Sequence, residues 1–101
     1  MQMNPNQTSQ RQIQIKISDE AMKGVYTNAM AVTHSKEEFV LDFMNLFPWQ
    51  QAGIVGARVI TSPGHLKRII SALQENLKKY ETQFGKVEEA KAPEEIGFKT
   101  S

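Results

Sequence analysis

The sequence contains no cysteine, so disulfide bonds and thiolate metal ligands cannot stabilise the fold, and no thiol nucleophile is present. The chain has 101 residues, enough for one domain at most. A domain of this size buries only about 60% of the surface that its unfolded chain exposes. Small domains without disulfides or metals are commonly stabilised by association. We therefore expect the chain to associate with itself, as a homodimer or a dimer of dimers.

A strong excess of charge is also absent, because 12 basic residues are balanced by 11 acidic ones. Proteins that track nucleic-acid phosphates usually have a strongly basic balance, so nucleic acid is not the expected partner. No apolar run approaches the roughly 20 residues that cross a bilayer. The opening stretch "MQMNPNQTSQRQ" lacks the apolar segment of a secretion signal. These absences predict a soluble, cytoplasmic protein with no membrane partner.

The sequence also contains few residues that could combine into a catalytic or metal-binding site. The two histidines, His34 and His65, are not joined to a ligand set by any metal-binding spacing. Gly53 and Gly56 are followed by a β-pattern rather than by the helix that a phosphate-binding loop requires, so they indicate a bulge or a close backbone contact. The sequence predicts a non-enzymatic protein with no cofactor, no metal site and no catalytic residue.

Both ends of the chain have compositions that disfavour packing. Residues 1–11 are rich in Gln, Asn, Ser and Thr, and residues 88–101 carry an acidic stretch in which only Ile96 and Phe98 offer apolar anchors. Such segments bury too little apolar surface to offset the entropy of ordering. We predict disordered tails at both ends of a single α+β domain, residues 12–87.

The domain begins with residue patterns of period two, which predict β-strands. In "QIQIKI", residues 12–17, the alternation places Ile13, Ile15 and Ile17 on one face of a half-buried strand. "SDEAMKG" then predicts a connection or a single helical turn. Three more strands, apolar on both faces, are predicted at residues 25–34, 39–47 and 54–61. Short connections between them predict a four-stranded antiparallel sheet.

One long amphipathic helix is predicted after the last strand. Its apolar residues recur with a period of 3.6 and form one stripe: Leu66, Ile69, Ile70, Leu73, Leu77, Tyr80 and Phe84. Ser62 suits the N-cap, Pro63 the first helical position and Gly85 the C-terminal cap. We expect this helix to pack on one face of the sheet.

One helix covers one sheet face, yet the predicted strands are apolar on both, and a monomer rarely exposes so large an apolar patch. We therefore expect the uncovered face to meet a second copy. The candidate interface residues are Met30, Val32, Val40, Met44 and Ile60, with Phe47 and Trp49 as a contact for another protein or peptide. In the alternative, the loop at residues 45–53 folds over that face, and Trp49 plugs the core.

Two groups of polar residues have open interpretations. If the strands that carry Asp42 and Arg58 form a hairpin, the two side chains neutralise each other, which would hold the register or form part of an interface. At the helix start, His65, Lys67 and Arg68 fit a solvated face. Alternatively they contact an anion or an acidic partner, because free amides and the helix dipole favour negative charge there.

Two motifs carry a resemblance to a known family: "VYTNAMAVTHSKEEFVLDF" and "ARVITSPGHLKRIISALQENLKKYETQFG". Over about residues 12–87 the chain resembles the small prokaryotic family catalogued as domain of unknown function 3467. The most specific pieces are Tyr26, Asn28, the block from Glu38-Phe39 to Asp42-Phe43, Arg58-Val59, Ser62-Pro63 and the ending from Tyr80 to Gly85. The resemblance supports the element boundaries and implies no activity, because the family has none assigned.

In architecture alone, four antiparallel strands beside a long helix are similar to the export chaperone SecB, which assembles as a dimer of dimers. No residue motif supports this likeness, so no binding residue is carried over, and fold analogy does not carry function. The likeness implies binding of unfolded or extended peptide as an alternative function. The five methionines would suit such an adaptable surface.

The leading interpretation is a self-associating module that binds another protein. Besides the chaperone alternative, weak nucleic-acid binding would use the outer helix face, where the acidic Glu75 and Glu81 dilute the positive charge of Lys67, Arg68, Lys78 and Lys79. A third alternative is an enzyme or a small-ligand pocket at the strand–helix corner, formed by Asp42, Arg58 and His65.

Overall fold

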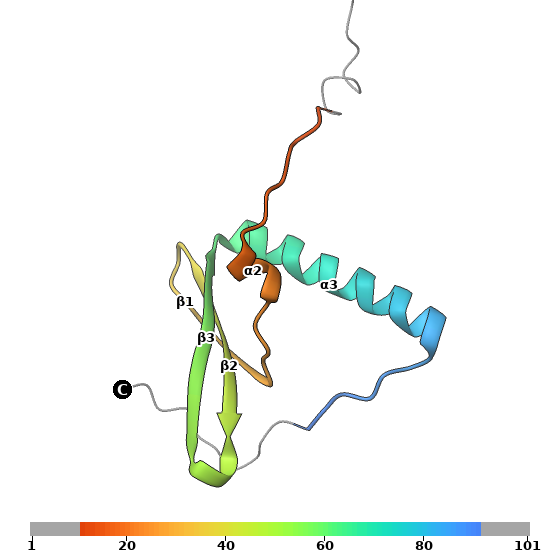
Figure 1. The fold of residues 1–101 in the computed structure, drawn as a ribbon. Coiled ribbons are helices and arrows are strands. Elements are labelled where there is room, and N and C mark those ends of the chain that lie inside the picture. The colour runs from red at the N-terminus through yellow and green to blue at the C-terminus, as the bar shows by residue number, and fades with distance from the viewer. Residues whose placement is uncertain (1–10, 92–101) are drawn as a thin grey trace, which may run out of the picture.

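The structure, a computed structural model, describes residues 11–91 (Figure 1). Its elements are α2 (Asp19–Lys23), β1 (Ala29–His34), β2 (Phe39–Phe47), the 3₁₀ turn η1 (Pro48–Gln50), β3 (Ala52–Thr61) and α3 (Pro63–Phe84). The α+β class is confirmed: an antiparallel sheet is followed by a long helix. Within the described residues, no helix has both the length and the apolar content needed to cross a bilayer. The tail residues 1–10 and 92–101, with the anchors Ile96 and Phe98, lie outside the described range.

The sheet has three strands in the order β1-β2-β3, with both pairs antiparallel. Strand β2 is central because it has the most apolar sequence and can be covered from both sides. Among residues 11–91, the buried apolar side chains all lie on it: Leu41, Met44 and Leu46. The turn between β1 and β2 is closed by Ser35, whose N–H donates to the carbonyl of Glu38 at 2.9 Å. The core of a single copy is therefore very small.

The expected fourth strand, at residues 12–17, is wrong for the single chain. These residues are extended but pair with no strand in the described range, and they lead away from the sheet (Figure 1). The side chains of Ile13, Ile15 and Ile17 are 82%, 89% and 58% exposed. An alternating sequence shows that a segment suits a strand, but it does not supply the neighbour that completes the backbone hydrogen bonds.

Strand β3 contains a bulge at Gly56, as its glycine predicted. Phe43 pairs with Ala57 and Met44 pairs with Val55, which leaves Gly56 without an opposite residue. A Cβ atom at this position would lie 2.8 Å from Cγ1 of Val25, so only glycine fits without a shift. The bulge also places Val55 on the opposite sheet face from Ala57, whereas strict alternation would put both on the same face.

Cross-strand partners share a sheet face, so the register defines the two faces. We call one the helix-side face, because two of its residues, Met30 and Phe43, line a groove together with Leu73 of α3. The middle of this face is apolar and consists of Met30, Val32, Phe39, Leu41, Phe43, Ala57 and Val59, whereas the polar residues His34, Asn45 and Thr61 lie toward its ends. We call the other the outer face; it carries Ala31, Val40, Asp42, Met44, Arg58 and Ile60.

Helix α3 begins and ends where its caps predicted. The Ser62 hydroxyl accepts a hydrogen bond from the N–H of His65 at 3.2 Å, and Pro63 occupies the first turn. At the other end Gly85 has a φ of 99°, and its N–H donates to the carbonyl of Glu81 at 2.9 Å. Positive φ values favour glycine, which is why the helix stops there.

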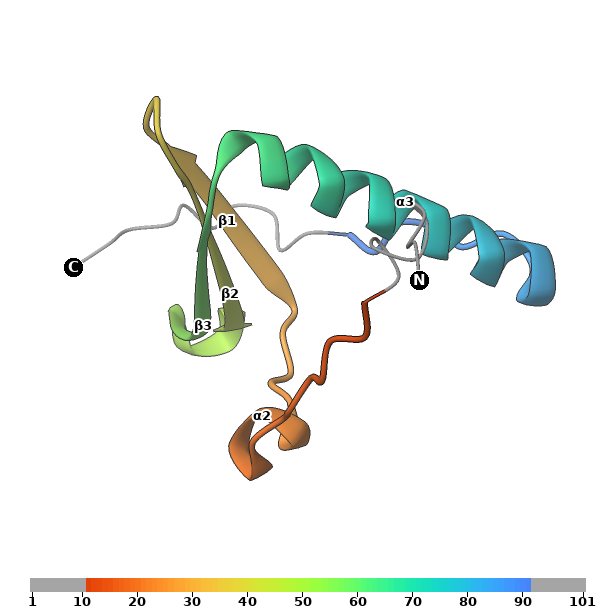
Figure 2. The ribbon, with the colours of Figure 1, turned by 90° about the horizontal axis from the view of Figure 1, so that it is seen from above.

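The position of α3 differs from the expected packing on the sheet. Seen from above, the helix leaves the end of β3 and runs away from the strands (Figure 2). Only Ser62 separates the last strand residue, Thr61, from the first helical residue, Pro63. The residue before a proline is restricted to extended backbone, and Ser62 has φ −76° and ψ 157°. This corner has no loop that could turn the helix back over its own sheet.

Candidate interaction surface

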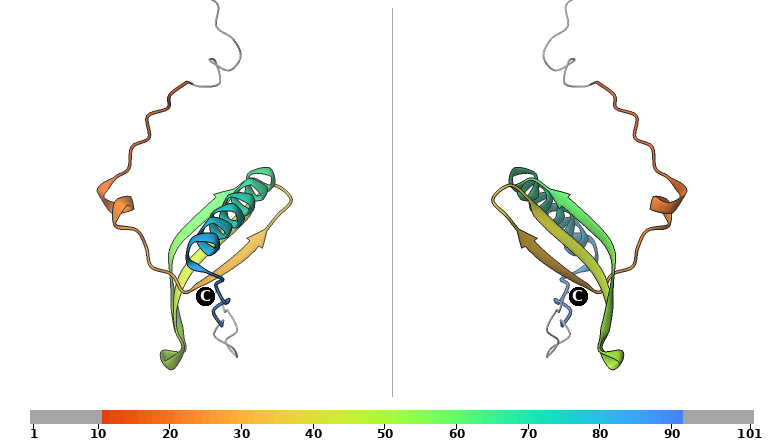
Figure 3. Two further views of the ribbon diagram at one scale, coloured as in Figure 1. Left: turned by 90° about the vertical axis from the view of Figure 1, so that its right-hand side faces the viewer. Right: turned by 90° about the vertical axis from the view of Figure 1, so that its left-hand side faces the viewer.

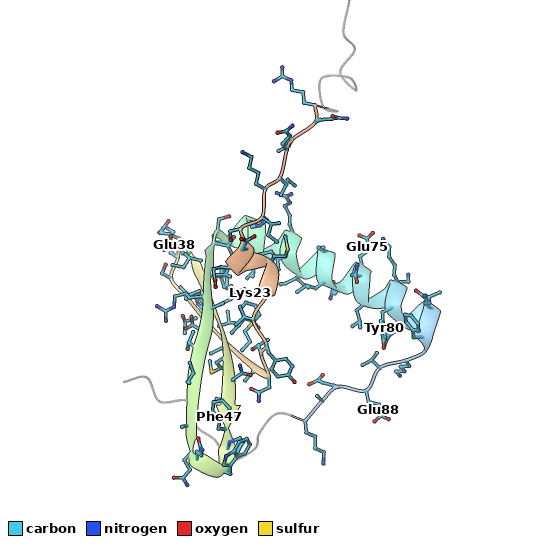
Figure 4. The ribbon with its side chains drawn as sticks, viewed as in Figure 1. Lys23, Glu38, Phe47, Glu75, Tyr80 and Glu88 are labelled. Atoms are coloured by element: carbon cyan, nitrogen blue, oxygen red, sulfur yellow. The ribbon has the colours of Figure 1, made fainter. Side chains whose placement is uncertain are left out.

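The first part of the surface is the apolar stripe of α3, hereafter the helix stripe, formed by Leu66, Ile69, Ile70, Leu73, Leu77, Tyr80 and Phe84. Near the corner Leu66 and Ile69 are half-buried, but further along the side chains of Leu73, Leu77 and Phe84 are 66%, 51% and 66% exposed. Tyr80 and Phe84 pack on each other with ring centroids 4.9 Å apart. In Figure 4, Tyr80 lies on the lower side of α3 and Glu75 on the upper side.

The second part is the helix-side face of the sheet. Its central side chain, Leu41, is buried, whereas Met30, Val32 and Val59 around it are exposed. A groove of about 710 Å³ lies between this face and α3, lined by Met30, Phe43 and Leu73 among others. Because the two parts adjoin at this groove, the helix stripe and the helix-side face form one continuous surface, which we call the open apolar surface.

The exposure of individual side chains shows the extent of the open apolar surface. On the sheet, Met30, Val32 and Val59 are each at least 43% exposed, and on α3 the side chains from Ile70 to Phe84 in the helix stripe are each at least 46% exposed. Within residues 11–91, large apolar side chains therefore remain uncovered on both parts of this surface.

On the outer face, Asp42 and Arg58 are cross-strand partners. The Arg58 guanidinium donates two hydrogen bonds to the carboxylate, from Nε to Oδ1 at 2.7 Å and from Nη2 to Oδ2 at 2.9 Å. These bonds hold the pKa of Asp42 below its ordinary value, against the opposing effect of its partial burial, and they raise the pKa of Arg58. Both groups are therefore ionised at neutral pH, and their pairing joins β2 to β3.

A second polar cluster closes the end of the sheet where β1 begins. The Asn28 side chain imitates a strand backbone: its Nδ2 donates to the Leu46 carbonyl at 3.1 Å, and its Oδ1 accepts from the Leu46 N–H at 2.8 Å. Asn45 Nδ2 donates to the Tyr26 carbonyl at 2.8 Å. Sequence reasoning singled out Asn28 as part of a motif but overlooked Asn45. These bonds explain why Tyr26 and Asn28 belong together in one motif.

The proposed anion contacts lie along the first turns of α3. A shallow hollow of about 510 Å³ is lined by His65, Lys67, Arg68, Ile69, Ser71, Ala72 and Glu75. The N–H of His65 is already bonded to Ser62, and proline has no N–H to offer, so few amides remain for an anion. Neither Asp42 nor Arg58 lines the hollow, so the structure does not bring the corner residues into one pocket. Among residues 11–91, no group of three or more potential ligands could hold a metal ion.

The turn between β2 and β3 carries the aromatic candidates. Phe47 ends β2 and Trp49 lies in η1, with their rings 5.7 Å apart in an edge-to-face contact. Trp49 is 76% exposed, so the interpretation that it plugs the core is wrong. Figure 4 shows Phe47 at the hairpin end of the sheet, far from α3. The loop at residues 45–53 therefore does not close either sheet face.

The five candidate interface residues fall on two surfaces. Met30 and Val32 belong to the helix-side face, whereas Val40, Met44 and Ile60 belong to the outer face. Met44 is only 8% exposed, so the chain itself already covers it. Sequence reasoning missed the far half of the helix stripe as a contact surface, because it assumed that the sheet covers the stripe.

Comparisons with known proteins give one match. The family model described as "Protein of unknown function (DUF3467)" matches residues 1–89. Neither the curated proteins nor the solved structures contain a significant match to the chain. The architectural likeness to SecB therefore gains no support, and the sheet has three strands rather than the four on which that likeness depended.

Proposed function

Since the chain belongs to the DUF3467 family, whose description assigns no activity, we propose from the geometry that it is a self-associating protein-interaction module, a homodimer formed through the open apolar surface. The helix stripe is the observation that carries this proposal. In proteins, most of the stability of an amphipathic helix comes from the packing of its apolar face. The far half of α3 has no such packing within residues 11–91, since no residue of the helix is buried.

A second copy is the occupant that this surface suits best. Each chain offers both a projecting apolar helix and an apolar sheet face with little cover. A two-fold axis places the helix of one copy against the helix-side face of the other, and the same contact repeats in reverse. Both uncovered parts are then buried together, in an arrangement that closes at two copies.

Large apolar side chains stay exposed on both the helix-side face and the helix stripe. A two-fold contact would bury both sets from each copy at once, and a standard interface covers about 800 Å² on each partner. A further protein would then have the exposed Trp49 and its neighbour Phe47 as a contact, since aromatic residues are frequent interface anchors.

The proposal is tested by mass in solution, measured by light scattering at micromolar concentration. We expect twice the chain mass of 11.4 kDa. Replacing Leu77 by Glu places a charge in the proposed interface and is expected to raise the dimer Kd at least tenfold. The matched control is Ser71→Glu, which adds the same charge at an exposed position of α3 outside the helix stripe. A single-copy mass for the unmodified chain, or equal effects of the two variants, contradicts the proposal.

A further inference from the structure

The extended segment of residues 12–17 has the properties of a strand without a sheet. Its three isoleucines point to one side by alternation, and all three are exposed. Neither the backbone nor the side chains of this segment hydrogen-bond to any residue in the range 11–91. Six residues that alternate Gln or Lys with Ile would satisfy their backbone groups by adding to the edge of a sheet.

The sheet offers such an edge at β3. Strand β3 has ten residues and pairs only with β2 in the described part of the chain, so its other side presents unpaired N–H and C=O groups. Natural sheets protect free edges with Lys or Pro, and β3 has neither. Instead it exposes large apolar side chains, Ile54, Val55, Val59 and Ile60. The edge of β1 is shorter, and Ala29 and Met30 already share a groove with Ala90 and Lys91.

We infer that residues 12–17 of one copy add as a fourth strand to the β3 edge of a second copy, in a reciprocal exchange. This inference rests on the proposed self-association and names its second contact. In Figure 3, the chain that leads to this segment passes on the β3 side of the sheet, away from β1. Val25, which lies against Gly56 of β3, marks where the chain leaves the sheet. On the N-terminal side of Gly24, which has a φ of 73°, the chain runs away from its own sheet, so that both the segment and the β3 edge are unpaired within the described residues.

The two faces of the segment determine how it is oriented on β3. The isoleucines continue the apolar helix-side face, beside Ala57 and Val59, and the polar side chains continue the outer face, beside Arg58. Lys16 is repelled by Arg58, so Gln12 or Gln14 takes the place next to the guanidinium. If Gln12 lies beside Arg58, Ile13 lies beside Ala57 in an antiparallel pairing and beside Val59 in a parallel one. If Gln14 lies beside Arg58, these two neighbours are exchanged. Ile13 is therefore the neighbour of Ala57 or Val59 in every arrangement.

The absence of cysteine makes this a clean disulfide test. Two double variants, Ile13→Cys with Ala57→Cys and Ile13→Cys with Val59→Cys, are oxidised and run on a non-reducing gel. We expect a band at twice the chain mass in at least one of them, at least tenfold stronger than in either single-cysteine variant. The control Gln14→Cys with Val59→Cys places the cysteines on opposite sheet faces and gives no such band.

Each other outcome overturns the inference in a distinguishable way. A crosslink at the mass of one chain shows that the segment pairs with its own edge. No crosslink in a chain that light scattering shows to be a dimer removes the strand exchange and leaves the proposed dimer standing. A single-copy mass for the unmodified chain removes both.

Discussion

Arg58 lies directly opposite Asp42 across β2 and β3 and donates two hydrogen bonds to its carboxylate, of 2.7 and 2.9 Å. Paired, planar donors of this kind give geometric specificity as well as attraction. A shift of the register by one residue would place the two side chains on opposite faces. The pair therefore favours the observed alignment of the two strands over its neighbours.

The pH dependence of stability follows from this pair. Because the pKa of Asp42 in the folded chain is below its ordinary value of 3.8, its contribution is fully present above that pH. The contribution is lost as pH falls through the lower, folded-state pKa. Arg58 stays protonated in both states over this range and adds no slope. Thermal unfolding at pH 7 and pH 3 is expected to show a smaller difference for Asp42→Asn than for the unmodified chain.

The control for that measurement is Glu20→Gln. Glu20 pairs with Lys23 at 3.3 Å, but both side chains are exposed, so this variant removes the same charge from a pair that contributes little. We expect its unfolding curve to follow that of the unmodified chain at both pH values. If Asp42→Asn behaves like Glu20→Gln, the cross-strand pair does not stabilise the fold.

Replacing Asn28 by Ala is expected to lower the free energy of unfolding by about 1–2 kcal/mol, because it removes two hydrogen bonds to Leu46 and leaves that backbone N–H without its partner. Asn45→Ala removes one bond, to Tyr26, and should cost about half as much. Urea denaturation measures both. Equal effects of the two variants would contradict the strand-like role of Asn28.

A substitution in the bulge at Gly56 is expected to destabilise the fold, and a second substitution at Val25 is expected to restore part of the lost stability. Gly56→Ala is expected to destabilise the fold by about 1–3 kcal/mol, because the new methyl group would meet Val25. Combining it with Val25→Ala frees the space, so the double variant should be more stable than the sum of the single effects predicts. Gly64→Ala is the control, since nothing lies within 4 Å of a Cβ atom there. That change should stabilise α3 by up to about 1 kcal/mol.

Trp49 can be followed by its own fluorescence, because it is the only tryptophan of the chain. At 76% exposure its emission should be that of a solvated indole and be quenched readily by iodide. Trp49→Ala is expected to change stability by less than about 0.5 kcal/mol while weakening capture of a partner protein. Blue-shifted emission from the dimer would mean that self-association, rather than another protein, covers this residue.

Local features of the fold were predictable from the sequence because their causes are local. The helix starts at Pro63 and stops before Gly85, as the cap residues require, and the bulge falls at a glycine. The strand pairing follows because short connections between consecutive strands leave few alternatives. Asp42 and Arg58 meet because a hairpin in the expected register brings those two positions together.

Two of the features that sequence reasoning missed depend on a neighbour. The pattern at residues 12–17 is correct for a strand, but the pattern contains no information on which edge would receive it. Similarly, the helix stripe predicts that α3 packs against apolar side chains, and reasoning from one chain assigned its own sheet to that role. The bulge is a local effect: Val55 lies on the opposite face from Ala57 because one extra residue reverses the alternation beyond it.

Because Ser62 alone joins β3 to α3, a small rotation at this corner moves the far end of the helix by a large distance. A helix of 22 residues is about 33 Å long, so a rotation of ten degrees at its base displaces the far end by about 6 Å. The width of the groove between α3 and the sheet therefore depends on the backbone angles of Ser62. Substitutions that change those backbone angles would therefore alter this width without changing any residue on the open apolar surface.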